Sequence, residues 1–418
     1  MKKSLIALAA LAAVGAASAQ SSVTLYGRLD VGYGSQTSEM RATPTGTNAV
    51  RSRGVMDGGQ TSNALGFRGV EDLGGGLKAT FTIEQGINPT GGALFAGRNG
   101  SAAQQVAYPV AFTNNIGAVG GIPSLSAITA STNRQSYIGL STASMGTFNI
   151  GYHYTNLYEL STLSGYNLGT EGLPGAFTSH TFGASYAGGA RSNGVTYISP
   201  VFAGGFTVRA QYGANGATPE INNSTTAAGG TNTAEGRRTS LMGQYANGPL
   251  SVALSYTRNR INTSAAGIAG ITATGGSRSG NLTQLGGSYD FGVVKLGGTY
   301  NVGRDGGIGA ANFGAAAGTS TRYRSYQVGL SAPFGAFVPF VTAGRAFAET
   351  DGAGARAIDV RQAQVGVRYS VSKRTTAYAF YGTATDNAAQ STVASIAAAT
   401  AASVYRDKKT IVGIAHSF

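Results

Sequence analysis

The residue types that usually perform catalysis are scarce in this chain. It has three histidines, His153, His180 and His416, and no cysteine, so it lacks a thiol nucleophile and cysteine ligands for zinc. Serine is abundant, but no paired acid and base accompanies it, and no calcium-binding spacing occurs. The pattern argues against an enzyme and predicts no metal or cofactor.

The charged residues are few and strongly unbalanced toward arginine and lysine. They make up 11% of the chain, and the formal net charge is +13. The basic residues are spread one or two per predicted strand and form no run of the kind that binds nucleic acid. Scattered charges of one sign suit either a solvated surface or a cavity that attracts anions. The faces that carry them decide between these alternatives.

Apolar and polar residues alternate along much of the chain, which predicts β-strands. In the first hairpin, Leu65, Phe67 and Phe81 share one parity, and a glycine-rich turn separates the two strands. The same arrangement predicts seven hairpins, with strand pairs at 63–71 and 77–84, 136–140 and 148–154, 195–198 and 206–212, 238–245 and 250–258, 282–289 and 294–302, 323–330 and 337–347, and 359–369 and 376–385. A first strand at 22–31 and a last at 410–418 bring the total to 16.

Short turns alternate strictly with long connections. The long connections are rich in Gly, Ala, Ser, Thr and Asn and are expected near 35–62, 87–133, 156–190, 213–237, 261–281, 304–321, 348–358 and 386–404. A compact soluble domain rarely carries so many long loops, and a soluble β-sandwich or repetitive adhesin would not confine them to one end. The pattern predicts an all-β fold: a 16-stranded antiparallel transmembrane β-barrel with short periplasmic turns and long extracellular loops, closed by its first and last strands.

Residues 1–19 are expected to be a signal peptide that is removed, leaving residues 20–418 as the barrel domain. Two lysines precede an apolar run over residues 5–14, and Ala-Ser-Ala at 17–19 offers a cleavage site. The run is short of the roughly 20 residues that a membrane-spanning helix needs. The sequence therefore predicts export to the outer membrane.

One parity of each predicted strand contacts lipid, and the other lines a hydrated interior. A barrel of this size is too wide for its side chains to fill, so the interior is expected to be a channel. Basic residues on the inward parity are expected to form the constriction wall: Arg28, Arg68, Lys78 and Arg209. Arg258 and Arg345 share the apolar parity near strand ends and could instead reach lipid phosphates.

The connection after residues 148–154 is expected to fold into the barrel. It carries two carboxylates, Glu159 and Glu171, which would face the arginine-bearing wall. Opposed charges across a narrow gap create a transverse field that orders water and biases the choice of ion. The alternative interpretation is an ordinary surface loop with two solvated glutamates.

Four segments carry a family resemblance. They are residues 21–27, the hairpin at 65–79, residues 134–140 and the terminal stretch 412–418. Together and in this order they resemble Gram-negative general diffusion porins of the 16-stranded trimeric type. The resemblance implies a homotrimer, each subunit with a pore narrowed by its third loop, a second loop that latches onto a neighbouring subunit, and recognition of Phe418 by the outer-membrane assembly machinery.

Members close to this type are often anion-selective, with arginines at the constriction, and Arg28 and Arg68 fall in the matching strands. The third loop here is poor in aspartate, which departs from the family pattern. We expect passive diffusion of small anionic or neutral hydrophilic solutes, contact with outer-membrane lipid and lipopolysaccharide, and no nucleic-acid partner. A substrate-specific outer-membrane channel for an anionic or polar solute stays open as the alternative, because a sequence does not give the mutual positions of lumen residues.

Overall fold

The structure is a computed structural model, and it describes residues 22–42, 46–90, 133–164, 191–214, 233–264, 276–304, 320–351, 356–386 and 403–418. The strands in these ranges are β1 (Ser22–Ala42), β2 (Gly46–Asp57), β3 (Ala64–Gly74), β4 (Leu77–Gly86), β5 (Asn133–Thr142), β6 (Gly146–Tyr154), β7 (Arg191–Ile198), β8 (Phe206–Ala214), β9 (Thr233–Asn247), β10 (Leu250–Ser264), β11 (Gly276–Asp290), β12 (Lys295–Arg304), β13 (Thr321–Ser331), β14 (Phe337–Thr350), β15 (Arg356–Ser370), β16 (Thr375–Asp386) and β17 (Ser403–Ser417). The helix α3 (Asn156–Ser164) follows β6. No helix in the described ranges is long and apolar enough to cross a membrane.

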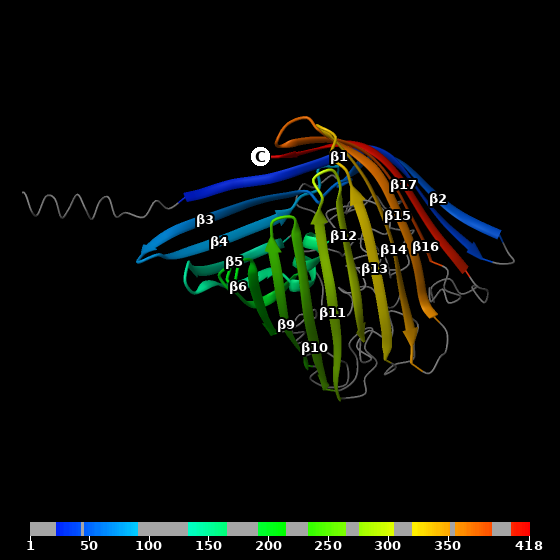
Figure 1. Cartoon of the computed structure of the whole chain (residues 1–418). Helices are drawn as coiled ribbons and strands as arrows, with labels where there is room; N and C mark the ends of the chain where they lie inside the picture. The colour runs from blue at the N-terminus through cyan, green and yellow to red at the C-terminus, as the bar shows by residue number, and fades with distance from the viewer. Residues whose placement is uncertain are drawn as a thin grey trace, which may run out of the picture.

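The strands form one closed antiparallel barrel. From β3 to β17 each strand pairs with the next, and β1 pairs with both β17 and β3 (Figure 1). The strands β2 and β3 lie end to end beside β1: β2 pairs with its second half from Val31, and β3 with its first half up to Arg28. They therefore occupy one position in the wall, and the predicted barrel of 16 strands is confirmed.

Several strands are longer than predicted, and the expected connection at 35–62 is wrong. The strand β1 continues to Ala42, and β2 covers Gly46–Asp57. The missed part of β1 pairs with β17 on one side and β2 on the other, so its backbone groups are satisfied without an apolar face. Its Gly, Ser and Thr residues do not alternate with apolar residues, and alternation was the signal on which the prediction relied.

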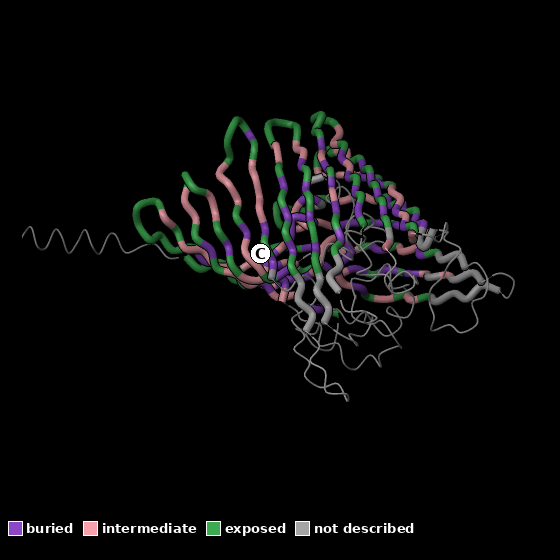
Figure 2. Tube along the Cα trace, turned by 90° about the horizontal axis from the view of Figure 1, so that it is seen from below, coloured by how far each residue is buried: buried purple, intermediate pink, exposed green. Residues whose placement is uncertain are grey.

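The apolar parity faces outward, as predicted. Val23 is 65% exposed, and Leu25, Ile138 and Val412 are also more than half exposed. Along the strands, exposed residues alternate with buried ones (Figure 2). Large exposed aliphatic side chains in regular rows are expected where lipid is the solvent.

Large rings lie flat on glycines of neighbouring strands. A Cβ at Gly413 would collide with the ring of Tyr378, and one at Gly366 would collide with Phe380. On the outer face, the ring of Phe418 covers Gly27 in the same way. These glycines let bulky side chains lie along the wall where a side chain of their own would displace the ring.

Candidate pore constriction

Glu84 of β4 is the centre of a charged cluster on the inner wall. Its carboxylate is bonded by Arg134 Nε at 2.6 Å, by the Tyr26 hydroxyl at 3.1 Å and by the Tyr154 hydroxyl at 3.4 Å. Arg28 Nη2 lies 3.5 Å from the same carboxylate. Glu84 is 3% exposed, so its charge is stabilised by these donors in place of water.

Arg134 was not among the predicted site residues, and a bulge explains the omission. It shares the parity of Ile138 and Leu140, which face outward. Pairing between β4 and β5 shifts near Arg134: Glu84 lies opposite Gln135, whereas Gln85 lies opposite Asn133. The extra residue turns the Arg134 side chain inward, a re-aiming typical of β-bulges. Counting parity alone therefore assigns Arg134 to the wrong face.

The predicted residues Arg28 and Arg68 lie near this cluster. Arg28 Nε donates to the Ser62 carbonyl oxygen at 2.5 Å, and its side chain is about one quarter exposed. The Arg68 guanidinium lies 5.3 Å from the ring centroid of Tyr26 and is exposed on the inward parity. Arg28 and Arg68 therefore place two cationic groups beside a buried carboxylate.

Lys78 lies elsewhere on the inner wall. It is exposed beside the turn between β3 and β4, about 20 Å from Glu84 at roughly 3.3 Å per strand residue. The structure therefore does not bring Lys78 together with the arginines. Its predicted place in the constriction wall finds no support in this geometry.

The predicted inward connection begins with α3, which packs on the inner side of the opposite wall. Leu157 and Leu160 are fully buried, and Leu160 clusters with Met242 of β9 and Ala253 of β10. Asn156, at the start of the helix, donates its backbone N–H to Gln211 Oε1 at 2.7 Å. Apolar burial and a satisfied helix start together fix the entry of this connection into the barrel.

Glu159 of α3 pairs with Arg209 of β8, so these two predicted residues are in contact. Arg209 Nη1 lies 3.0 Å from Glu159 Oε1, and Arg209 Nη2 donates to the Tyr154 carbonyl oxygen at 3.2 Å. Because the Tyr154 hydroxyl also accepts from Arg134 Nη2 at 3.0 Å, one tyrosine joins the two charged groups. Glu171 lies outside the described residues.

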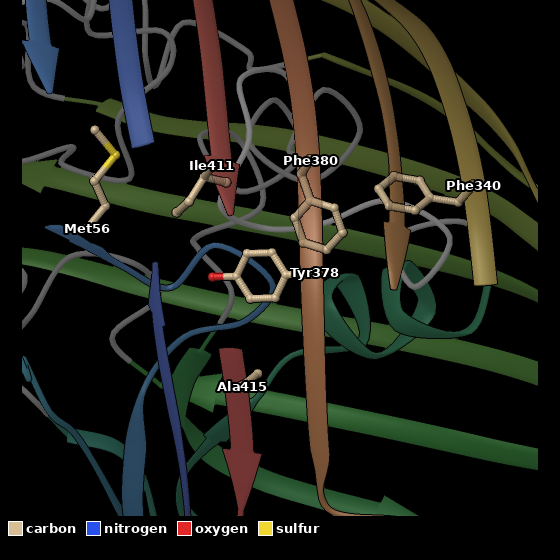
Figure 3. Packing of buried hydrophobic residues seen from close by; sticks show 6 residues of the cluster. All are labelled: Met56, Phe340, Tyr378, Phe380, Ile411 and Ala415. Atoms are coloured by element: carbon tan, nitrogen blue, oxygen red, sulfur yellow. The ribbon is translucent and has the colours of Figure 1, made fainter. Parts of the chain in front are cut away.

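A third inner-wall feature, near the barrel closure, was not predicted. The residues Met56, Phe340, Tyr378, Phe380, Ile411 and Ala415 form a buried apolar cluster (Figure 3). The rings of Tyr378 and Phe380 stack with centroids 4.4 Å apart, and Arg368 lies 4.3 Å from the Phe340 ring centroid. The inner wall thus carries a charged cluster around β1, β4 and β5 and an apolar cluster on β14, β16 and β17.

The two arginines with ambiguous parity both lie on the outer face. Arg258 is exposed there, in line with Leu254. Arg345 is bonded to Asp359 through two contacts of 2.7 Å. In the described part of the chain, no group of three or more His, Cys, Asp or Glu residues could hold a metal ion.

Comparison with known proteins gives a consistent result. The family model of Gram-negative porins matches residues 6–389. An outer membrane porin protein of Bordetella pertussis is 32% identical over 289 residues, which cover 64% of this chain and 62% of that protein. Outer membrane porin protein 32 of Delftia acidovorans is 50% identical over 84 residues, which cover 20% of this chain and 22% of that protein. The matches thus span less than two thirds of these relatives.

Solved structures share the fold at low sequence identity. The anion-selective porin from Comamonas acidovorans aligns with a TM-score of 0.61 and 22% identity, covering 96% of this chain and 100% of that one. A trimer form of OmpT, an outer membrane protein of Vibrio cholerae, aligns with a TM-score of 0.53 and 15% identity over 94% of this chain and 99% of that one.

Proposed function

Because the chain belongs to the Gram-negative porin family, we propose that it forms a water-filled channel through which small hydrophilic solutes diffuse passively, with a preference for anions. The family and the fold place it in the outer membrane and indicate a channel in place of an enzyme. The anion preference is supported by one observation: the buried carboxylate of Glu84 is shared by Arg28 and Arg134, and Arg68 lies nearby. Positive charge therefore exceeds negative charge on this part of the wall.

The size of the preference follows from Coulomb's law. A unit charge about 6 Å from the ion path contributes ~0.7 kcal/mol in water, and ~0.4 kcal/mol after screening at 0.1 M salt. The contribution is favourable for an anion and equally unfavourable for a cation, so one exposed arginine changes the permeability ratio by about fourfold. Arg209 contributes less, because Glu159 compensates its charge.

Reversal potentials in a planar bilayer under a potassium chloride gradient test the proposal. The wild-type channel should prefer chloride, and Arg28→Ala and Arg68→Ala should each lower the chloride-to-potassium ratio. Arg258→Ala is the matched control, because it removes the same charge from the outer face. Potassium preference in the wild type, or absence of conductance from folded protein, would contradict the channel proposal. Unchanged selectivity in both variants would remove Arg28 and Arg68 from the constriction.

We also propose a homotrimer as the functional form, supported by a structural neighbour, OmpT of Vibrio cholerae, that has a trimer form. Exposed aromatic residues near the short turns of β8–β15 form pairs, such as Phe206 with Tyr245 and Phe337 with Tyr369, each 4.7 Å apart. The outer face of β4–β6 presents aliphatic side chains, Ile83, Ile138, Leu140 and Ile150, together with the ring of Phe148. Apolar side chains suit a subunit interface as well as lipid, and we propose the β4–β6 face for packing against another subunit. Cross-linking of Ile138→Cys between subunits would test this assignment.

Further partners are proposed on the same basis. Exposed outward arginines of β10, β13, β15 and β17, near the long-loop ends, would meet lipid or lipopolysaccharide phosphates: Arg258, Arg322, Arg324, Arg361 and Arg406. Phe418, at the end of the closing strand, would be read by the assembly machinery. Residues 1–19, outside the described ranges, would be the cleaved signal peptide.

A further inference from the structure

The six residues 58–63 interrupt the wall between β2 and β3. We name this segment the strap. Along β1, Arg28 lies opposite Ala64 and Val31 lies opposite Asp57, so the break falls opposite Leu29 and Asp30. Asp30 has the inward parity and is 0% exposed. A buried carboxylate therefore stands where the ladder is broken.

Asp30 bonds the strap at several points. Its Oδ2 accepts the backbone N–H groups of Gln60 and Thr61, each at 2.6 Å. Its backbone carbonyl accepts from the Gly58 N–H at 2.9 Å, and its own N–H donates to Asn63 Oδ1 at 2.5 Å. The side chain and backbone of one residue thus replace the ladder bonds that the break removes.

Tyr378 completes the attachment from β16. Its hydroxyl donates to Asp30 Oδ1 at 2.5 Å, and its ring lies over Gly413 of the intervening strand β17. A Cβ at Gly59 would collide with the Tyr378 hydroxyl, so the strap packs directly on this ring. The side chain thus reaches across the closure of the barrel to the segment that Asp30 holds.

The strap in turn contacts the charged cluster. The Ser62 carbonyl oxygen accepts from Arg28 Nε at 2.5 Å, which leaves Arg28 Nη2 directed toward Glu84 at 3.5 Å. A charge-assisted bond to a fixed carbonyl restricts a side chain that otherwise has many rotamers. We propose that Asp30 is a positioning residue of the pore: it holds the strap, and the strap holds Arg28. The inference rests on the proposed function only in taking Arg28 to face the permeating ions.

A positioning role and a simple charge effect predict opposite signs. Asp30→Asn removes a negative charge from the inner parity, which by electrostatics alone raises the preference for anions. If Asp30 acts through the strap, the same substitution frees Arg28 and lowers that preference, in the direction of Arg28→Ala. Asp407→Asn is the matched control, because Asp407 is a buried inner-parity carboxylate that accepts from Gln36 at 3.2 Å and lies eight residues along β17 from Ala415, the residue opposite Asp30.

Bilayer reversal potentials give the first readout. Asp30→Asn should lower the chloride-to-potassium ratio, by less than the roughly fourfold change that loss of one exposed, unpaired arginine would give, whereas Asp407→Asn should not lower it. Tyr378→Phe keeps every charge and should shift the ratio in the same direction by less. If Asp30→Asn does not assemble, the ratio of Tyr378→Phe is compared with that of Asp407→Asn instead. An increased or unchanged ratio in the assembled Asp30 variant would overturn the proposal.

Thiol labelling gives a readout that does not depend on selectivity. The chain has no cysteine, so Thr61→Cys places a single thiol on the strap. Labelling by a cationic methanethiosulfonate reagent should be severalfold faster in the Asp30→Asn background than in the parent. If labelling is faster but Arg28→Ala does not change selectivity, Asp30 holds the strap as proposed, and the role assigned to Arg28 is overturned. Equal labelling rates, with a clear effect of Arg28→Ala, would overturn the positioning role of Asp30 and leave the channel proposal standing.

Discussion

Replacing Glu84 by glutamine perturbs the charged cluster with little change of shape. Glutamine retains an oxygen that can accept from Arg134 Nε, the 2.6 Å contact, but it carries no charge. The two arginines that share the carboxylate then lose its compensating charge. We expect a higher anion preference together with lower stability, because the same carboxylate neutralises part of the arginine charge and accepts the hydrogen bonds of the cluster.

The two magnitudes follow from burial and distance. Glu84 lies behind its donors, so we place its charge about 8 Å from the ion path, where screened interaction is ~0.2 kcal/mol and the permeability ratio rises about twofold. A hydrogen bond to a charged group is worth ~1.5–3 kcal/mol against ~1 kcal/mol for a neutral one, so Glu84→Gln should cost about 1–2 kcal/mol. Glu84→Ala also leaves the Arg134 charge buried and unpaired, which should cost about 3–5 kcal/mol.

Two assays separate these effects. Reversal potentials of reconstituted Glu84→Gln channels measure the permeability ratio, and denaturant unfolding in detergent measures stability for the glutamine and alanine variants. Unchanged or lower anion preference in folded Glu84→Gln channels would show that the carboxylate does not compensate the arginines that ions encounter. An alanine variant as stable as the glutamine variant would contradict the expected cost of leaving the Arg134 charge unpaired.

Three further outcomes are expected. Deleting Phe418 should slow assembly into membranes more than it alters conductance, and Gly27→Val should act similarly, because the valine side chain would displace the Phe418 ring. The assembly rate of both variants can be followed by the appearance of heat-resistant protein in detergent. Normal assembly kinetics would contradict this prediction. Glu159→Gln should raise anion preference by freeing Arg209, and unchanged reversal potentials would argue that this pair lies away from the ion path. Arg345→Ala leaves Asp359 without its 2.7 Å partner on the outer face and should lower the denaturation midpoint without changing selectivity.

Regular parts of this barrel follow from the sequence, and the irregular parts do not. Outward residues such as Leu25 and Val412 are readable because lipid requires apolar side chains at every second position. The second half of β1 and the strand β2 could not be predicted. Here β1 pairs with β17 on one side and with β2 on the other, so backbone pairing holds the segment without an alternating apolar face. The contact of Glu159 with Arg209 agrees with the expected opposition of charges, whereas the meeting of Arg28 with Glu84 across β3 required knowledge of register.

The charged cluster depends on two breaks in the hydrogen-bond ladder, and this explains why periodicity identified Arg28 but not Arg134. A regular strand presents one inward side chain for every two residues, so it spreads charges along the barrel axis. The bulge at Arg134 turns an additional arginine inward beside Glu84. The break opposite Asp30 exposes the Ser62 carbonyl that holds Arg28 at the same carboxylate. Two irregularities, far apart in the chain, thus gather charge at one level of the wall. A sequence search for such a constriction should therefore look for interrupted alternation next to arginine, since uninterrupted alternation predicts only the wall.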